Sequence, residues 1–526
     1  MSDSNKRNFI VHGSILAMAG ILVRIIGMLY RIPVLNIIGS EGNGIYSVAF
    51  NIYNIMLVLS SYGLPMAVSK LVSARFSTKQ YKSAKRVLRC SMIIAVISGG
   101  CAALLVFFGA DFIENVIYNG GLPGLAIPLR VLAPTIFLVA VLGVIRGFFQ
   151  GQGTMIPTAV SQIFEQIINA IVSIAAGYGM MKGFASSPEV AAYGAAGSTM
   201  GTALGALTAL LFMGFLYSVY NPTFSRMVRK DRHRVRETDG QICSVIIFTM
   251  VPIILGQTFY QISALIDDVM FSNIMVGRDI SNSITTDLGN FGSSYSLLIS
   301  IPQGIATAMS ASMLPSIVAS FSIGEFEEIH NKITKTLKTT MFVAVPSFAG
   351  LVILGQPIIK LLFSRYDSAQ GAMMLKIGAI AVVFYTLSTV TGSALQAINK
   401  MKLPMIHSFI SLVIHVVLVF VLLKFSALGI YALVIGNATF PVIIFILNFR
   451  ALYYESDYEL PVISVFANPV ISSLIMGICS GIAYKALFAS SGSNALSLIM
   501  AMCVAFVSYF GPYILINKSG IFERYN

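Results

Sequence analysis

The sequence is a succession of long apolar segments separated by short polar ones. About fourteen of these segments reach the ~20 apolar residues that a helix needs to cross a bilayer. They cover residues 13–37, 46–69, 88–110, 125–149, 155–180, 190–218, 243–275, 288–319, 337–362, 372–397, 404–424, 428–449, 463–488 and 494–517. Lipid offers no hydrogen bonds to an open backbone, and the segments lack the strict alternation of membrane strands. We therefore expect an all-α membrane protein with about 14 transmembrane helices.

The composition excludes several classes of function. Of the 526 residues, 56% are hydrophobic and 10% are charged, whereas a soluble domain carries about a quarter charged residues. The net charge of +13 does not indicate nucleic acid binding, because the basic residues cluster between apolar segments. The five cysteines form no CxxC pair, and no GxxxxGK or HExxH motif occurs. We expect no disulfide framework, no metal site and no enzymatic activity.

The basic residues of the short loops indicate an orientation. Residues 70–89 include seven lysines and arginines and no acid, and residues 224–240 are also rich in arginine. The intervening loop 110–124 carries only Asp111 and Glu114 as charged residues. Because an excess of lysine and arginine marks the cytoplasmic side, we predict a multi-pass cell-membrane protein with both termini in the cytoplasm. The same loops would also attract anionic lipid headgroups.

Parts of the sequence repeat after about 250 residues, which suggests two related halves. "GNGIYSVAFNIYNIMLVLSSYGLPMAVS" (42–69) resembles "SSYSLLISIPQGIATAMSASMLPSIVAS" (293–320). "FFQGQGTMIPTAVSQI" (148–163) resembles "ALQAINKMKLPMIHSFI" (394–410). Six spans is an even number, so the halves keep one orientation and form a parallel repeat about an axis along the membrane normal. The predicted parts are a six-helix lobe at 1–240, a second six-helix lobe at 241–450, and an accessory helix pair with a tail at 451–526.

Three segments resemble a known family of transporters. They are "VRIIGMLYRIPVLNIIGSEGNGIYSVAF", "YGLPMAVSKLVS" and "RGFFQGQGTMIPTAVSQIFEQI", and the resemblance extends over nearly the whole chain. They look like the stage V sporulation protein B branch of polysaccharide flippases, in the multidrug/oligosaccharidyl-lipid/polysaccharide exporter superfamily. The resemblance implies a two-lobed alternating-access transporter, related to the flippase for the lipid-linked peptidoglycan precursor. It also implies that the last two helices form a groove for a long lipid tail.

The first apolar segment carries Arg24 and Arg31, although an arginine near a bilayer centre costs at least ~2.5 kcal/mol. At ~100° per residue, the two side chains point about 20° apart and lie about 10 Å apart along one helix face. Gly27 lies on the same face and is expected to leave open space there. Two guanidinium groups in this arrangement can clamp an anion such as a diphosphate. They match the paired first-helix arginines of the related flippases, but segments 45–69 and 288–320 lack the further arginines of those relatives.

Other interpretations of these charges stay open. Arg31 can snorkel to the interface instead, and Arg24 can pair with Asp267 or Asp268 of the seventh segment, which repeats the first. The resemblance implies a seventh-helix carboxylate that binds a coupling cation, so both aspartates are also candidates for coupling to Na⁺ or H⁺. Glu165 is a further intramembrane carboxylate, with either a packing or a proton-relay role. No other cofactor is expected.

Glycines in the sixth segment indicate where helices pack closely. Gly197, Gly201 and Gly205 recur every four residues, which is the small-residue pattern of close contacts between membrane helices. We expect a neighbouring helix to lie directly against this face.

These observations favour a flippase that moves a lipid-diphosphate-linked saccharide from the inner to the outer leaflet. The saccharide would be a peptidoglycan precursor or a polysaccharide unit. The alternative is an ion-coupled multidrug exporter of the same fold, but cationic drugs favour a carboxylate-lined cavity, and Arg24 argues against one. A membrane-embedded transferase would need acidic, metal-binding motifs in long loops, which are absent from the sequence. We expect a monomer whose partners are the lipid-linked substrate and the bilayer.

Overall fold

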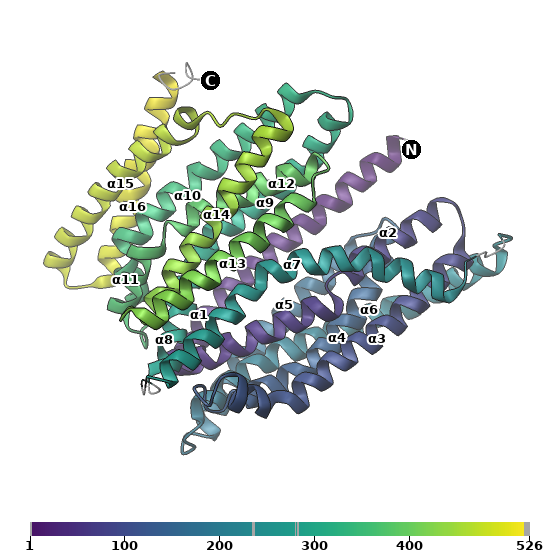
Figure 1. Ribbon diagram of the computed structural model, residues 1–526, viewed down its shortest axis with the longest axis horizontal. Helices are drawn as coiled ribbons and strands as arrows, with labels where there is room; N and C mark the ends of the chain where they lie inside the picture. The colour runs from purple at the N-terminus through teal and green to yellow at the C-terminus, as the bar shows by residue number, and fades with distance from the viewer. Residues whose placement is uncertain (1–2, 234–236, 279, 281–282, 520–526) are drawn as a thin grey trace. The chain divides into compact units, whose positions relative to one another are not determined.

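The computed structural model describes residues 3–233, 237–278, 280 and 283–519, and in these residues the chain forms helices and no strand. The helices are α1 (Asp3–Ser61), α2 (Leu64–Ser77), α3 (Tyr81–Phe112), α4 (Ala126–Gly151), α5 (Ile156–Gly183), α6 (Val190–Lys230), α7 (Asp239–Val276), α8 (Ile284–Asn290), α9 (Leu298–Ser322), α10 (Phe326–Leu362), α11 (Ser368–Gly378), α12 (Ala381–Ala397), α13 (Lys402–Phe425), α14 (Tyr431–Ser456), α15 (Val462–Ser491) and α16 (Asn494–Ser519), with π-helical turns η1 (Ile113–Ile117) and η3 (Phe291–Leu297) (Figure 1). Among the described residues, 11 helices are long and apolar enough to cross a membrane, or up to 12 if the bent pair α11–α12 counts as one span. The first of these candidate spans holds two of the predicted apolar segments. The prediction of an all-α membrane protein is confirmed.

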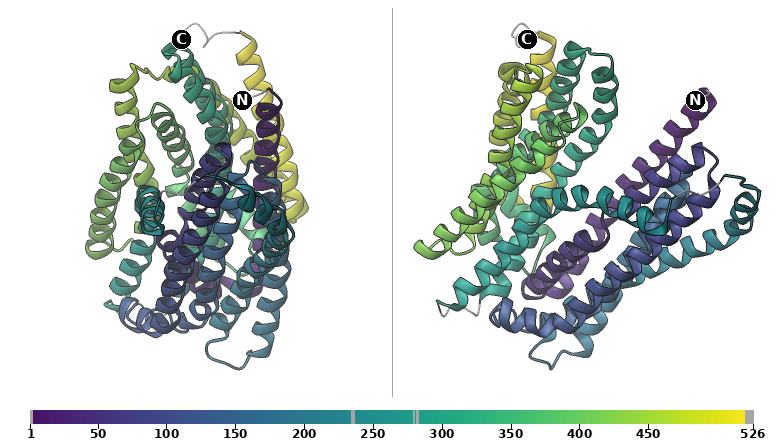
Figure 2. Two further views of the ribbon diagram at one scale, coloured as in Figure 1. Left: turned by 90° about the vertical axis from the view of Figure 1, so that its right-hand side faces the viewer. Right: turned by 45° about the vertical axis from the view of Figure 1, so that its right-hand side comes forward.

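The chain divides into two compact units, Met1–Thr286 and Asp287–Asn526. In the first unit, α7 begins where Thr238 and Gln241 form a reciprocal capping box, and it packs against α1, α2 and α3. In the second unit, α15 and α16 lie side by side and pack against α10 (Figure 2). The division into lobes at 1–240 and 241–450 with an accessory pair at 451–526 stays a prediction.

Helix α1 turns back on itself at Gly39. This residue has φ 70° and ψ −178°, a backbone conformation that is essentially restricted to glycine. The Arg31 guanidinium lies 6.0 Å from the centroid of the Phe50 ring, whereas 19 residues of unbroken helix would span about 28 Å. The first part of α1 (3–38) therefore folds against the second part (40–61). A single glycine replaces the connecting loop that the two separate apolar segments had suggested.

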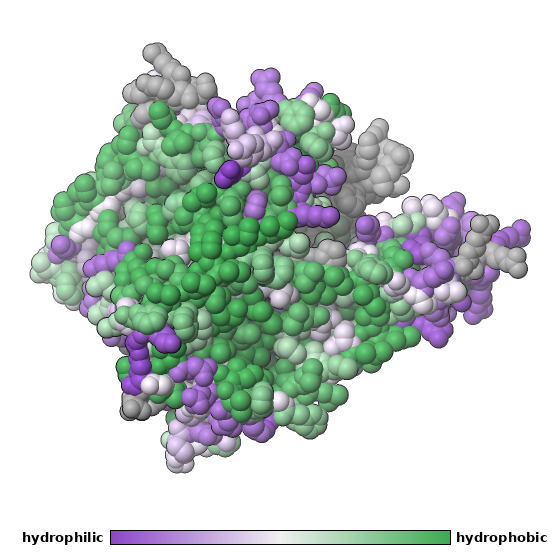
Figure 3. Space-filling model, viewed as in Figure 1, coloured by the Kyte–Doolittle hydropathy of each residue, from purple (hydrophilic) through white to green (hydrophobic). Residues whose placement is uncertain are grey.

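Hydrophobic side chains cover the flanks of the helices, and hydrophilic side chains gather near their ends (Figure 3). This distribution suits helices that have lipid around their flanks and water at their ends. One hydrophilic end of the first unit contains the predicted basic loop 70–89 together with the connection from α6 to α7. Residues 234–236 of the predicted basic loop 224–240 lie outside the described residues.

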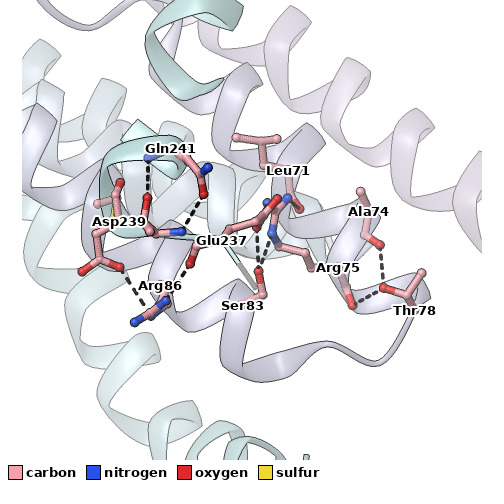
Figure 4. Close-up of polar contacts among 11 residues, drawn as sticks. Leu71, Ala74, Arg75, Thr78, Ser83, Arg86, Glu237, Asp239 and Gln241 are labelled. Atoms are coloured by element: carbon pink, nitrogen blue, oxygen red, sulfur yellow. Dashed lines mark hydrogen bonds and ion pairs between the residues drawn. The ribbon is translucent and has the colours of Figure 1, made fainter. Parts of the chain in front are cut away.

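The connection between α6 and α7 is bound to α2 and α3 by ion pairs (Figure 4). Arg75 pairs with Glu237 at 2.7 Å, and Arg86 pairs with Asp239 at 3.4 Å. Arg86 also donates a hydrogen bond to the backbone carbonyl of Glu237. The carboxylates of Glu237 and Asp239 are 47% and 45% exposed, so each pair contributes only about 0–1 kcal/mol.

A buried carboxylate also holds the end of α6 against the start of α3. The side chain of Asp231 is fully buried, and its Oδ2 accepts a 2.8 Å hydrogen bond from the backbone N–H of Lys82. Its Oδ1 lies 2.8 Å from both the backbone nitrogen and the ring Nδ1 of His233. Lys82 is in the first turn of α3, so the carboxylate at the end of α6 caps another helix. Burial alone would raise the pKa of Asp231, but the hydrogen bonds from Lys82 and His233 outweigh it and lower the pKa below its usual value.

We expect Gly39→Ala to lower the thermal unfolding midpoint of the purified protein in detergent, because a side chain in this conformation costs about 1–3 kcal/mol. Gly109→Ala in α3 is the matched control, since its added Cβ would meet no atom within 4 Å. The control should unfold at the wild-type temperature or slightly above it. Equal midpoints for the two variants would show that the turn at Gly39 is not strained by a side chain.

We expect Asp231→Asn to lower the unfolding midpoint at neutral pH, with a difference from wild type that shrinks in acid. A carboxyl group whose pKa is lowered in the folded state contributes its full stabilisation of the fold at pH values above its unfolded pKa of about 4. This contribution is lost as the pH falls through the lower pKa of the folded state. Thermal unfolding at a series of pH values from about 7 to about 3 measures the difference. Asp111→Asn, which removes a 62% exposed carboxylate, is the control. A difference for Asp231→Asn that is constant down to the lowest pH would contradict this assignment.

Candidate functional site

The predicted arginines lie on the first part of α1 in different environments. Arg24 is exposed, whereas Arg31 is half-buried, with its guanidinium 6.0 Å from the centroid of the Phe50 ring. The hydroxyl groups of Tyr30 and Tyr46 also interact with Arg31, and Tyr46 stacks on Phe50 with 5.6 Å between ring centroids. An aromatic face attracts a guanidinium through its quadrupole. The contacts with Tyr46 and Phe50 direct Arg31 toward the second part of α1. This direction favours a role inside the protein over snorkelling to the membrane interface.

The space expected beside Gly27 is not empty, so that expectation was wrong. A Cβ added at Gly27 would lie 3.2 Å from Nε2 of Gln166, a residue of α5. Gly27 lies one turn from Arg24 and one turn from Arg31 on the same face of α1. The face that carries the two arginines therefore also meets a neutral amide from α5.

Glu165 is paired with an arginine that the sequence analysis did not single out. Its Oε2 lies 2.8 Å from a terminal nitrogen of Arg146, which belongs to α4. The Nε of Arg146 donates a 3.0 Å hydrogen bond to the hydroxyl of Ser161. The Arg146 and Glu165 side chains are 13% and 28% exposed, so the pair is well shielded from water. Arg146 lies within the predicted apolar segment 125–149, and that position is the signal that could have identified it.

Asp267 and Asp268 lie on α7, and each is 5% exposed. The Oδ2 of Asp268 accepts a 2.8 Å hydrogen bond from the amide of Asn51, on the second part of α1. The buried phenol of Tyr118 also interacts electrostatically with Asp268. An amide partner satisfies one lone pair of a carboxylate but does not neutralise its charge. This pair of adjacent acids therefore has the chemistry to take up a proton or a cation.

Glycines of α6 bring α5 close enough to take part in the site. Cβ atoms added at Gly197, Gly201 and Gly205 would lie 2.1–2.6 Å from backbone or side-chain atoms of α5. The predicted close packing at this glycine face is confirmed. The resulting position of α5 allows the Asn169 amide to donate a 3.3 Å hydrogen bond to the Tyr30 hydroxyl of α1.

The first unit thus brings together two kinds of charged group. The arginine face of α1 meets the polar side of α5, and the Asp268 carboxylate of α7 meets the second part of α1. Within the described residues, no group of three or more histidine, cysteine or acidic side chains could hold a metal ion.

Comparison with protein families gives two matches along the chain. The polysaccharide biosynthesis protein family matches residues 11–321, which is more than half of the chain. The MatE family matches residues 252–421.

Two proteins of Bacillus subtilis (strain 168) are similar over most of their length. The chain is 26% identical to the lipid II flippase MurJ over 420 residues, which is 78% of this chain and 76% of that protein. It is 23% identical to the stage V sporulation protein B over 524 residues, which is 98% of this chain and 97% of that protein. These relatives agree with the predictions of a multi-pass membrane transport protein that is not an enzyme.

Solved structures show the same fold. The lipid II flippase MurJ in an inward closed conformation matches with a TM-score of 0.68 at 16% identity, over 97% of this chain and 98% of that chain. An inward-facing multidrug resistance MATE family transporter of the MOP superfamily matches with a TM-score of 0.67 at 16% identity, over 85% of this chain and 98% of that chain. The chain belongs to the polysaccharide biosynthesis protein family.

Proposed function

We propose that the chain is a flippase that moves a lipid-diphosphate-linked saccharide from the inner to the outer leaflet. The main observation in support is that Arg24 and Arg31 lie on one face of α1, inside a predicted membrane span. A guanidinium forms strong, paired hydrogen bonds to phosphate oxygens, and this is the interaction that offsets the cost of placing arginine at such depth. The relatives named as lipid II flippases support a lipid-linked cargo.

The multidrug exporter alternative fits the charged groups less well. It would share the fold and would use carboxylates to bind cationic drugs. Asp267 and Asp268 are each 5% exposed, and Asp268 accepts a hydrogen bond from Asn51. These carboxylates are therefore not accessible to a large cation. Glu165 is paired with Arg146. Arg24, on the first part of α1, is exposed and positive.

Coupling to an ion is a separate part of the proposal. Asp267 and Asp268 are the candidates for binding Na⁺ or H⁺, because a buried pair of acids gains from a proton or cation that relieves their repulsion. The Arg146–Glu165 pair supports a packing role for Glu165 over a relay role. The distribution of basic residues supports a cytoplasmic position for both termini.

We expect Arg24→Ala to abolish transport of a fluorescent lipid-diphosphate saccharide in liposomes while the protein still inserts and folds. Removing a charge from a span lowers its insertion cost, so stability should not fall. Arg24→Lys should retain part of the activity, because a point charge replaces the planar fork of donors. Arg130→Ala is the control, since Arg130 forms a surface pair with Asp111.

The double variants Arg24→Ala/Asp267→Asn and Arg24→Ala/Asp268→Asn separate the anion site from an ion pair. If Arg24 paired with either acid, the single variant would leave a buried carboxylate unpaired, at a typical cost of ~3–5 kcal/mol. Neutralising that acid would then restore both thermal stability and transport. Such a recovery would refute the anion site, whereas stable and inactive protein in every combination supports it.

We expect transport to slow when the membrane potential is collapsed. A cell interior is negative, so outward movement of a diphosphate is assisted by ~2.3 kcal/mol per charge per 100 mV. Proteoliposomes with a potassium diffusion potential, with and without valinomycin, measure this effect. Transport that ignores the potential and needs a sodium or proton gradient would instead assign the driving force to Asp267 and Asp268.

A further inference from the structure

The contact between Gly27 and Gln166 places an amide at the middle of the arginine face of α1. Arg24 and Arg31 are one turn before and one turn after Gly27, and the Gln166 Nε2 lies 3.2 Å from the position of a Cβ on that glycine. A Cβ at position 27 would push this amide back by a few tenths of an ångström, and a larger side chain would push it further. The glycine thus makes room for a hydrogen-bond donor at the point where the helix itself offers only C–H groups.

Two flanking contacts fix the position of Gln166. Glu165, its neighbour in the chain, is held by Arg146 at 2.8 Å. Asn169, one turn further along α5, donates a 3.3 Å hydrogen bond to Tyr30 of α1. Because α5 is tied on both sides of Gln166, the backbone from which its side chain extends is held beside α1.

We propose that Gln166 is a third substrate-contacting residue, which donates a neutral hydrogen bond to the diphosphate between the guanidinium groups of Arg24 and Arg31. This inference rests on the proposed function. The two guanidinium groups reach the diphosphate from one turn before and one turn after Gly27, so an oxygen that lies between them needs a donor at the level of Gly27, where Gln166 offers one. A neutral donor satisfies such an oxygen without adding a third positive charge to a membrane span. Gln166 thereby favours a diphosphate over a monophosphate, which the two arginines alone can satisfy.

The test is equilibrium binding of farnesyl diphosphate and farnesyl monophosphate to the purified full-length protein in detergent, measured by calorimetry. Gln166→Leu keeps the bulk and removes the donor, so diphosphate binding should weaken about tenfold, with a smaller effect on the monophosphate. Gln166→Glu puts a carboxylate between the arginines. It should weaken binding further at pH ~7, because the carboxylate repels the diphosphate and competes with it for the two arginines.

Two glycine variants test the same contact with Gln166 left intact. Gly27→Ala pushes the amide back by a few tenths of an ångström, so diphosphate binding should weaken about threefold, less than in Gln166→Leu. Gly20→Ala lies seven residues earlier on the same face, and its added Cβ would meet no atom within 4 Å. This matched control should bind as the wild type does. Thermal unfolding midpoints of all variants should stay close to the wild-type value.

The outcomes separate the inference from the proposed function. Wild-type affinity in Gln166→Leu and Gly27→Ala, with binding lost in Arg24→Ala, would overturn the role of Gln166 and leave the proposed function standing. A wild-type protein that binds neither lipid would overturn both. Equal losses for the two lipids, accompanied by a lower unfolding midpoint, would show that Gln166 only packs between α1 and α5 and would overturn the inference.

Discussion

Hydrocarbon offers no hydrogen bonds, so every polar group within a membrane-spanning helix needs a partner from the protein, its ligand or enclosed water. The first unit satisfies this requirement with contacts between helices. Arg31 lies against the Phe50 ring, Arg146 is paired with Glu165, and Asp268 accepts a hydrogen bond from Asn51. These polar contacts determine which faces of α1, α4, α5 and α7 meet, because each charged side chain is stable only opposite its partner.

Hydropathy was enough to predict most of the fold. Each predicted apolar segment falls on one helix or on consecutive helices, because a span without internal backbone hydrogen bonds is not possible in lipid. The turn at Gly39 was not predictable in the same way. Hydropathy gives the length of apolar segments, whereas the turn depends on the φ of one residue, and glycine in a membrane helix is too common to mark a reversal.

The candidate site was only partly predictable, because partners in space are not visible along a chain. Arg24, Arg31, Asp267, Asp268 and Glu165 stand out as charges within apolar segments. The same rule would have found Arg146, which pairs with Glu165. Gln166 carries no charge, and its relevance depends on the approach of α5 to Gly27, which requires the close packing of α5 on α6. The partner of Asp268 is likewise set by the reversal of α1 and not by local sequence.

Phe50 and Asn51 are consecutive residues, and they contact side chains of opposite charge. Phe50 faces the Arg31 guanidinium, and Asn51 is bonded to the Asp268 carboxylate. Neighbours on a helix point about 100° apart, so one rotation of the second part of α1 about its own axis changes both contacts together. The contact of Arg31, which is a candidate for binding an anion, and the contact of Asp268, which is a candidate for binding a cation, are thus made by two residues joined by one peptide bond. A ligand at Arg31 that changes the orientation of this segment also changes the contact of Asp268, and the coupling free energy between the two sites is the same in both directions.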